Sequence, residues 1–579
     1  MNPSSYLRSK RRRILCYGAL AVLLSWVVLN WNATLRQIVL SYIPLPVADY
    51  WRVVQDYSQV KQLHLQVLWR QHNEHRILFP EIVFLLDAFL FGCRGILPLV
   101  VSFLCYVSLW IVIAWVLLSD KAVSRETRIA AALLAGLVMS WKGSASALAW
   151  PFLLQWTLTQ FGVLLSLVSI ALGKRKSKGN FFLAFAILCA AIATYSSADA
   201  LLLWPVLIVA ALLADLSKRQ ITALTLSAVF VIGCYFNGYV FSSSFHASDL
   251  FSHSLYAAGF VSAYLAMPFG NIKSPIFAVY LGVIQLVFTI SLLLYAWRTH
   301  LFKKTPAVIL FSYSVFVFLT AIATAAGRMN PADPTFTAAK AARYVTVPLV
   351  NWAVLVALCL WISGRRGGRM CPLPVLAICF ALLIGIGFLK LRWWLRVAGQ
   401  DFADVQEAAL SIQDGLTIPP LMQKIFEDPK LLAVELSELE KHHLSIYDKG
   451  PSRWLGHSVA ELGRPVASPV SGAITKAVAV PSGMQIFGWA DDGDQPPRYR
   501  WVVLTNEAGR IIGFAERFPI GIPRDFSDLP SPHWQSWTGF VKLPARGARI
   551  RAYVVASDGK RLLPISGSPL ELASGPAAR

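Results

Sequence analysis

Charged side chains are scarce in this chain of 579 residues. Asp, Glu, Lys and Arg together make up 15% of the sequence, whereas apolar residues make up 56%. Soluble domains carry about 25% charged residues, so this composition excludes an ordinary soluble globular protein. It indicates an α-helical polytopic membrane protein.

Acidic residues are scarcer than basic ones, with 31 Asp and Glu against 53 Lys and Arg, and the formal net charge is +22. In a soluble protein such an excess would suggest a nucleic-acid partner. Here most of the excess lies in six short loops between apolar runs, which hold 20 Lys and Arg and three acids. This is the positive-inside pattern of cytoplasmic loops, so we expect no nucleic-acid partner. The loops are residues 8–13, 119–129, 173–180, 215–220, 298–304 and 364–370.

Cysteine is also rare. The eight cysteines all precede residue 380, and no two have CxxC spacing. This pattern excludes a disulfide scaffold and a four-cysteine zinc site. The P-loop, the dinucleotide fingerprint and the nucleophile elbow of serine hydrolases are missing as well. The basic N-terminus precedes an apolar run that has no clear small-residue cleavage site, which predicts an uncleaved signal anchor.

Long apolar runs are abundant, and eleven of them are long enough to cross the hydrocarbon core of a bilayer. With the N-terminus in the cytoplasm, eleven crossings place all six basic loops inside and the C-terminus outside. The loops at residues 32–95 and 327–343 then lie on the outer face. The predicted spans are residues 14–31, 96–118, 129–148, 153–172, 181–198, 199–214, 221–241, 275–297, 306–326, 344–363 and 373–393.

Two further apolar runs are not counted as spans. A crossing at residues 254–269 would place the next basic loop outside, so we expect a re-entrant or interfacial helix there. In residues 77–91 the apolar run is interrupted by Glu81 and Asp87, which predicts an amphipathic helix on the outer surface. Together with the spans, these runs make up a predicted transmembrane domain of residues 1–393.

The C-terminal third has a different pattern. Residues 394–464 show helical spacing with a break at Pro419 and Pro420, which predicts an extracytoplasmic segment of short helices. From residue 465 the apolar residues alternate with polar ones between Asp, Gly and Pro turns, so residues 465–579 are predicted to form a small all-β sandwich. Four tryptophans of this domain fit either a carbohydrate platform or core packing: Trp489, Trp501, Trp534 and Trp537.

A dense polar segment between Asp49 and Arg76 follows the first span. Asp49 would lie near the lipid interface, where its carboxylate is placed to act as a general base on an acceptor hydroxyl. The alternative is that Asp49 caps the helix that begins there, because Asp is a favoured N-cap residue. Asp56 is a second candidate for the base.

Six consecutive hydrogen-bonding side chains, Gln71 to Arg76, end this segment. Such density is costly next to an apolar helix unless the side chains bind something, so we take His72, Glu74 and His75 as substrate-binding candidates. The two histidines and the glutamate could also ligate a divalent metal ion, although their spacing differs from that of zinc proteases. Arg76 suits a phosphate ligand, or it snorkels at a helix start.

Two other outer segments carry polar side chains of interest. Arg328, Lys340, Arg343 and Tyr344 gather around the loop at residues 327–343. Three cations on the outer side oppose the positive-inside bias and favour an anionic ligand, although pairing with acids or lipid headgroups is the alternative. Asp199 lies at an outer helix turn, where it either serves the site or caps the sixth span.

The whole pattern resembles the GT-C class of integral-membrane glycosyltransferases. The class has roughly eleven to thirteen spans, an acidic residue in the first outer loop and often a C-terminal soluble domain. Here Asp49 corresponds to that acid, residues 50–91 to interfacial helices and residues 401–579 to the appended domain. Asp49 is followed by Tyr50, whereas a second acid is common in the class. The motifs from Trp69 to Pro80 and from Gly327 to Tyr344 also resemble a set of uncharacterised bacterial inner-membrane proteins.

The resemblance implies a function on the periplasmic side of the bacterial inner membrane. The protein would transfer a sugar from a polyprenyl-phosphate carrier to a glycan or lipid acceptor, with its C-terminal domain in the periplasm. Asp49 would act on the acceptor, while arginines would hold the carrier phosphate. Two other functions stay open: a transporter or flippase for an anionic lipid-linked glycan, and a non-enzymatic envelope assembly protein.

Overall fold

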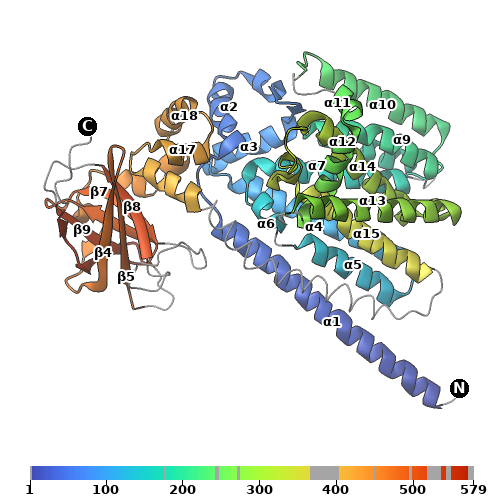
Figure 1. Cartoon of the computed structure of the whole chain (residues 1–579), viewed down its shortest axis with the longest axis horizontal. Helices are drawn as coiled ribbons and strands as arrows, with labels where there is room; N and C mark the ends of the chain where they lie inside the picture. The colour runs from blue at the N-terminus through green and yellow to red at the C-terminus, as the bar shows by residue number, and fades with distance from the viewer. Residues whose placement is uncertain are drawn as a thin grey trace. The chain divides into compact units, whose positions relative to one another are not determined.

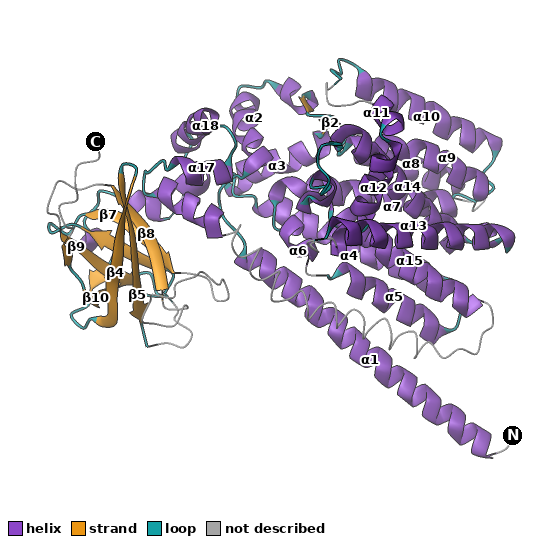
Figure 2. Cartoon of the chain, in the orientation of Figure 1, coloured by secondary structure: helices purple, strands orange, loops and turns teal. Residues whose placement is uncertain are grey.

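A computed structural model of the chain describes residues 3–365 and 403–571, except for residues 142, 175–177, 242–246, 270–273, 449, 494–498, 518–535 and 543–548. The chain forms two compact units. The first comprises Met1–Val39, Leu63–Phe84 and Ile96–Leu389, and the second comprises Leu40–Gln62, Leu85–Gly95 and Lys390–Arg579. Figure 1 follows the chain through both units, and Figure 2 distinguishes their helices from their strands.

The first unit is helical. Long helices alternate with short 3-10 turns. Helices α7, α14 and α15 are buried along most of their length, whereas α1, α10 and α13 expose most of their apolar side chains. The helices are α1 (Pro3–Leu40), α4 (Ile96–Ser119), α5 (Arg125–Met139), α6 (Gly143–Leu148), α7 (Leu154–Leu172), α8 (Gly179–Thr194), α9 (Leu203–Leu213), α10 (Lys218–Phe236), α11 (Ala247–Ser252), α12 (Ser254–Leu265), α13 (Pro275–Arg298), α14 (Thr305–Arg328) and α15 (Thr346–Arg365).

Seven helices of the described residues are long and apolar enough to cross a membrane, which indicates a membrane protein. They correspond to the predicted spans in α1, α4, α7, α10, α13, α14 and α15. Three other predicted spans fall on shorter helices, since α5, α8 and α9 have 15, 16 and 11 residues. The predicted span at residues 373–393 lies outside the described residues. The count of eleven crossings therefore stays a prediction.

The two runs that were not counted as spans are short helices. α12 has 12 residues, which is well below the roughly 20 that a crossing helix needs. α3 (Leu78–Phe91) has 14 residues. Its acids do not mark a solvent-facing side, because Glu81 is 1% exposed and Asp87 is fully buried. The amphipathic interpretation of residues 77–91 is therefore wrong in this respect.

Two parts of the chain between α1 and α4, Leu40–Gln62 and Leu85–Gly95, belong to the same compact unit as the C-terminal helices. α2 (Arg52–Lys61) packs on α18 (Pro429–Lys441), where Ser58 Oγ donates to a Glu438 carboxylate oxygen at 3.1 Å. Arg94 and Asp448 form an ion pair at 2.8 Å. These contacts join residues more than 350 positions apart, and no local pattern in the sequence predicts them.

Short helices fill the segment that precedes the strands, as predicted. Residues 403–413 are helical, and α17 (Pro419–Ile425) begins at the predicted break, with Pro419 in its first turn. Proline suits that position because its missing N–H would have no partner inside the helix. The segment ends with α19 (Val459–Leu462), just before the first strand of the C-terminal domain.

The C-terminal strands form one closed sheet rather than the predicted sandwich of two sheets. Their order is β11-β9-β6-β7-β8-β5-β4-β10-β3, and β10 also pairs with β9, which closes a barrel. Alternation along each strand is the same in both architectures, so the sequence could not distinguish them. The strands are β3 (Arg464–Pro465), β4 (Val470–Val480), β5 (Gly483–Asp491), β6 (Trp501–Thr505), β7 (Ile511–Arg517), β8 (Ser536–Lys542), β9 (Arg549–Val555), β10 (Arg561–Gly567) and β11 (Leu570–Glu571).

Side chains fill the barrel. Trp537 is fully buried in its core with apolar residues from the surrounding strands. Trp501 packs against Phe514, with ring centroids 5.7 Å apart. Core packing is therefore confirmed for Trp537, and Trp501 packs at the edge of a core cluster. Trp489 is half-buried, and Trp534 lies outside the described residues.

Asp414 connects the helical segment to the barrel. Its carboxylate, 1% exposed, accepts the backbone N–H groups of Phe514 at 2.9 Å and Phe540 at 3.1 Å, which face each other on β7 and β8. We expect D414A to destabilise this unit by about 2–6 kcal/mol, because each unpaired buried N–H costs about 1–3 kcal/mol. Urea denaturation measures the free energy of unfolding, and hydrogen exchange of the backbone amides measures the local protection of β7 and β8.

The matched control is D404N, whose side chain is 42% exposed and pairs with Lys424. We expect it to change stability by less than about 0.5 kcal/mol. Equal stability of D414A and D404N would show that the Asp414 contacts do not stabilise the barrel.

Candidate active site

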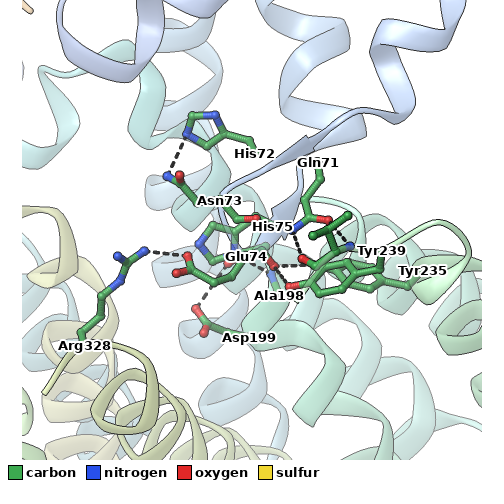
Figure 3. Close-up of polar contacts among 12 residues, drawn as sticks. Gln71, His72, Asn73, Glu74, His75, Ala198, Asp199, Tyr235, Tyr239 and Arg328 are labelled. Carbon is green, nitrogen blue, oxygen red and sulfur yellow. Dashed lines mark hydrogen bonds and ion pairs between the residues drawn. The ribbon is translucent and has the colours of Figure 1, made fainter. Parts of the chain in front are cut away.

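The polar run from Gln71 to Arg76 forms a small β-hairpin in the first unit. β1 (Gln71–His72) pairs with β2 (His75–Arg76), so that Gln71 faces Arg76 and His72 faces His75. The turn contains Asn73, whose φ of 49° lies in the left-handed region that asparagine tolerates better than most residues. Figure 3 shows how this turn presents Glu74 and His75.

The hairpin is attached to the end of α10. The hydroxyl groups of Tyr235 and Tyr239 each donate to the Glu74 carbonyl oxygen at 3.0 Å. The Gln71 side-chain amide donates to the Val240 carbonyl at 2.8 Å and accepts from the Val240 N–H at 3.0 Å. These contacts hold the turn in place against the chain that follows α10.

Arg76 belongs to this attachment and not to a phosphate site. The residue is 3% exposed, and its guanidinium donates to the carbonyl oxygens of Tyr235 at 2.6 Å, Asn237 at 2.5 Å and Trp69. The guanidinium also lies 5.1 Å from the Trp69 ring centroid. Because Arg76 is buried and each of its three guanidinium nitrogens donates to a carbonyl oxygen, the interpretation of Arg76 as a phosphate ligand is wrong, and a positioning role replaces it.

Glu74 points to α14. Its carboxylate lies 2.6 Å from the Arg328 guanidinium nitrogen, and both side chains are partly buried. In this close pair the carboxylate offsets the charge of Arg328. This contact matches the alternative in which the outer cations pair with acids.

Asp199 lies in the 3-10 turn η4 (Ala198–Leu202), outside the seven helices that are long enough to cross a membrane. In Figure 3 the Asp199 carboxylate lies near the Glu74 carboxylate, which is paired with the Arg328 guanidinium. The pKa of Asp199 is raised to about 7, mainly by burial and also by the charge of Glu74, against the lowering effects of the Ser197 hydroxyl and Arg328. The N-cap of η4 is Ser197, so Asp199 is not a cap.

His75 lies on the same turn. Its Nδ1 accepts the backbone N–H of Ala198 at 3.1 Å, and its ring meets Trp156 edge to face at 6.0 Å. Burial, together with the positive charges of Arg328 and Arg343, lowers the pKa of His75 to about 4. His75 is therefore neutral at physiological pH.

These side chains meet at a cavity of about 320 Å³ within the first unit. Glu74, His75, Asp199 and Arg328 form its polar part. Most of the remaining wall is apolar or aromatic, and it includes Trp156, Leu201, Leu202, Phe236, Tyr239, Phe241, Ala323, Thr324, Gly327 and Tyr344. A pocket with apolar walls and a few convergent polar groups is the usual form of a ligand site.

Of the predicted cations at residues 340–343, Arg343 lies next to a residue of the cavity wall. Tyr344, in η8 (Ala342–Tyr344), lines the cavity and packs against Trp156 at 5.5 Å. The Arg343 guanidinium lies 5.1 Å from the Tyr344 ring centroid. Among the described residues, neither Arg343 nor Lys340, at the end of η7 (Ala338–Lys340), forms an ion pair. Both remain available to an anion.

The two predicted catalytic aspartates belong to the second unit, and neither lines the cavity. Asp56 is fully buried and pairs with Arg52 at 3.0 Å, which is a structural contact. Asp49 is half-buried in η1 (Ala48–Trp51), and the N-cap there is Val47, so the capping alternative does not hold. His72 packs against Phe152 at 5.1 Å and does not line the cavity.

Several site residues were missed at the sequence level. Tyr235 and Tyr239 are four residues apart at the end of a predicted span, where tyrosines are usually part of the aromatic belt at the membrane interface. Their hydrogen bonds to the hairpin come from tertiary structure and leave no local signal. Among the residues that the structure describes, no group of three or more His, Cys, Asp or Glu side chains is placed to hold a metal ion.

Comparisons with models of protein families, with curated protein sequences and with solved structures gave no match. The function must therefore be argued from the cavity itself. The arrangement joins a carboxylate that titrates near neutral pH, a neutral imidazole and cations beside an apolar wall.

Proposed function

We propose that the protein is a membrane glycosyltransferase that takes a sugar from a polyprenyl-phosphate carrier and passes it to a glycan or lipid acceptor. The observation that carries the proposal is the convergence of Glu74, His75, Asp199 and Arg328 on one largely apolar cavity. Apolar walls suit a lipid-linked substrate, and the polar groups suit its head. We place the reaction on the periplasmic side of a bacterial inner membrane.

Asp199 is the better general base of the two cavity carboxylates. A base works best when its pKa lies near the working pH, and the pKa of Asp199 is about 7. Glu74 already forms an ion pair with Arg328 at 2.6 Å, so its carboxylate is less available to an acceptor hydroxyl. We therefore move the base role from Asp49 and Asp56 to Asp199.

The proposed step is a direct displacement. The acceptor hydroxyl oxygen forms a bond to the anomeric carbon, while the bond from that carbon to the carrier phosphate oxygen breaks. The bonding electron pair leaves on the phosphate oxygen, and the hydroxyl proton passes to the Asp199 carboxylate. The products are the glycoside and polyprenyl phosphate, and Asp199 then returns its proton to solvent.

The phosphate gains negative charge in this step, so a cation must face it. Arg343 is the best placed candidate, because it has no ion-pair partner among the described residues and lies over Tyr344 at the cavity wall. Lys340 is the second candidate. Arg328 contributes mainly by fixing Glu74.

Turnover of a radiolabelled polyprenyl-phosphate sugar by the purified chain in lipid nanodiscs tests the proposal. We expect the wild type to transfer label to an added acceptor extract and D199N to lose this activity. The matched control is D215N, because Asp215 is exposed and pairs with Lys174 in another loop. Binding of the donor without turnover in any variant would instead support the transporter or assembly function.

A further inference from the structure

We propose that His75 is a neutral hydrogen-bond donor that binds a hydroxyl oxygen of the sugar through Nε2–H. This inference rests on the proposed function and deepens it, because it assigns the cavity to the uncharged, hydroxylated part of the substrate. It separates that part from the phosphate, which would lie toward Arg343.

The backbone contact defines the protonation of the ring. The Ala198 N–H can only donate, and it points to Nδ1 at 3.1 Å, so Nδ1 must offer its lone pair. A neutral histidine with a free Nδ1 lone pair carries its proton on Nε2. A doubly protonated ring would break this contact and would add a third positive charge near Arg328 and Arg343.

The other ring nitrogen is unoccupied by the protein. His75 makes one hydrogen bond among the described residues, the one at Nδ1, and its ring lines the cavity. Edge-to-face packing on Trp156 fixes the orientation of the ring. A hydrogen-bond donor of fixed orientation is therefore available to a ligand in the cavity, and that ligand must offer an oxygen or nitrogen acceptor.

The charges around His75 favour an uncharged ligand group. Glu74 neutralises Arg328 across 2.6 Å, and Asp199 adds a carboxylate that is at least half ionised above its pKa of about 7. Among the described residues that line the cavity, the only arginine is thus already paired with an acid, so the lining offers no unpaired cation to a phosphate. Hydroxyl groups fit it well, since they donate to carboxylates and accept from Nε2–H.

The same tautomer argues against a metal ion at His75. A metal binds a ring nitrogen through its lone pair, but the Nδ1 lone pair already accepts the Ala198 N–H, and Nε2 carries the proton. The earlier option of a divalent ion on His72, Glu74 and His75 does not fit this arrangement, because the His72 ring packs instead on Phe152.

Nitrogen NMR of the full chain with ¹⁵N-labelled histidine in nanodiscs tests the tautomer. The H75Q spectrum identifies the His75 signals among those of the ten histidines. We expect a pair of signals from a protonated Nε2 and an unprotonated Nδ1, unchanged between pH 5.5 and 8. A protonated Nδ1 at pH 7 would overturn the proposal.

Ligand binding tests the chemistry of the site. The probes are alkyl glycosides of glucose, galactose, mannose and N-acetylglucosamine, compared with inorganic phosphate at equal concentration. We expect at least one glycoside to shift the Nε2–H signal of His75, and phosphate to leave it unchanged. A shift with phosphate alone, or with no glycoside, would contradict the assignment.

Two substitutions separate the donor from a structural role. In H75N the amide oxygen can accept the Ala198 N–H but the side chain no longer reaches the ligand, whereas H75Q offers an amide N–H near the Nε2 position. We expect glycoside binding about tenfold weaker in H75N, the usual effect of losing one hydrogen bond, and within about threefold of wild type in H75Q.

Equal binding by H75N and wild type would overturn the proposal. Failure of the proposed function looks different, because glycoside binding and the NMR shift would then persist while no sugar is transferred from the polyprenyl-phosphate donor. The two claims can therefore fail separately.

Discussion

Replacing Asp199 by Asn is expected to lower kcat for sugar transfer by about 10²- to 10⁴-fold, the usual contribution of a general base. The amide keeps the shape of the side chain and its contact with the Ser197 hydroxyl but cannot take the acceptor proton. The donor KM should change little. Initial rates at saturating donor measure the effect, with D215N as the control.

The pH profile gives the same prediction a second readout. The pKa of Asp199 is about 7, and a base acts only when it is deprotonated. The kcat/KM of the wild type should therefore rise with pH through about 7 and then level off. Because the charge of Glu74 raises this pKa, E74Q should shift the rise to lower pH. A D199N enzyme with the wild-type rate and the same rise would contradict the assignment.

Replacing Arg343 by Ala is expected to lower kcat by about 10²- to 10³-fold, the usual loss when one donor to a developing negative charge is removed. Arg343 lies over Tyr344 at the cavity wall and has no ion-pair partner among the described residues. R343K should recover part of the rate, because it restores the charge without the planar fork of donors.

R298A is the matched control for R343A, since Arg298 is an exposed arginine at the end of α13. Single-turnover transfer, with binding of donor measured separately, distinguishes loss of catalysis from loss of affinity. An R343A protein that transfers at the wild-type rate would move the phosphate site elsewhere.

The sequence predicted the helices far better than it predicted their connections. Runs such as residues 275–297 and 306–326 fall on α13 and α14 because a continuous apolar run long enough to cross a bilayer has few other stable forms. The hairpin at residues 71–76 was not predicted. Its two strands have two residues each, which is too short to show the alternation of polar and apolar residues that marks a strand. They depend on contacts with Tyr235 and Val240.

The site was predicted in part. Glu74, His75, Asp199, Arg328 and Tyr344 were singled out as polar groups on the outer face, and all five line the cavity. Arg76 was misread, because its carbonyl partners near Tyr235 are set by tertiary folding. Asp49 was favoured for its place after the first span, yet the structure places it in the second unit.

Blocking the cavity tests the central claim most directly. Gly327 in α14 lines the cavity, and a Cβ added there has no heavy atom within 4 Å, so we expect a larger side chain at this position to take up cavity space. We predict that G327L lowers transfer from the polyprenyl-phosphate sugar at least about tenfold, while G327A stays near the wild type and both unfold at the wild-type temperature. Wild-type transfer by G327L would show that the reaction does not occur in this cavity.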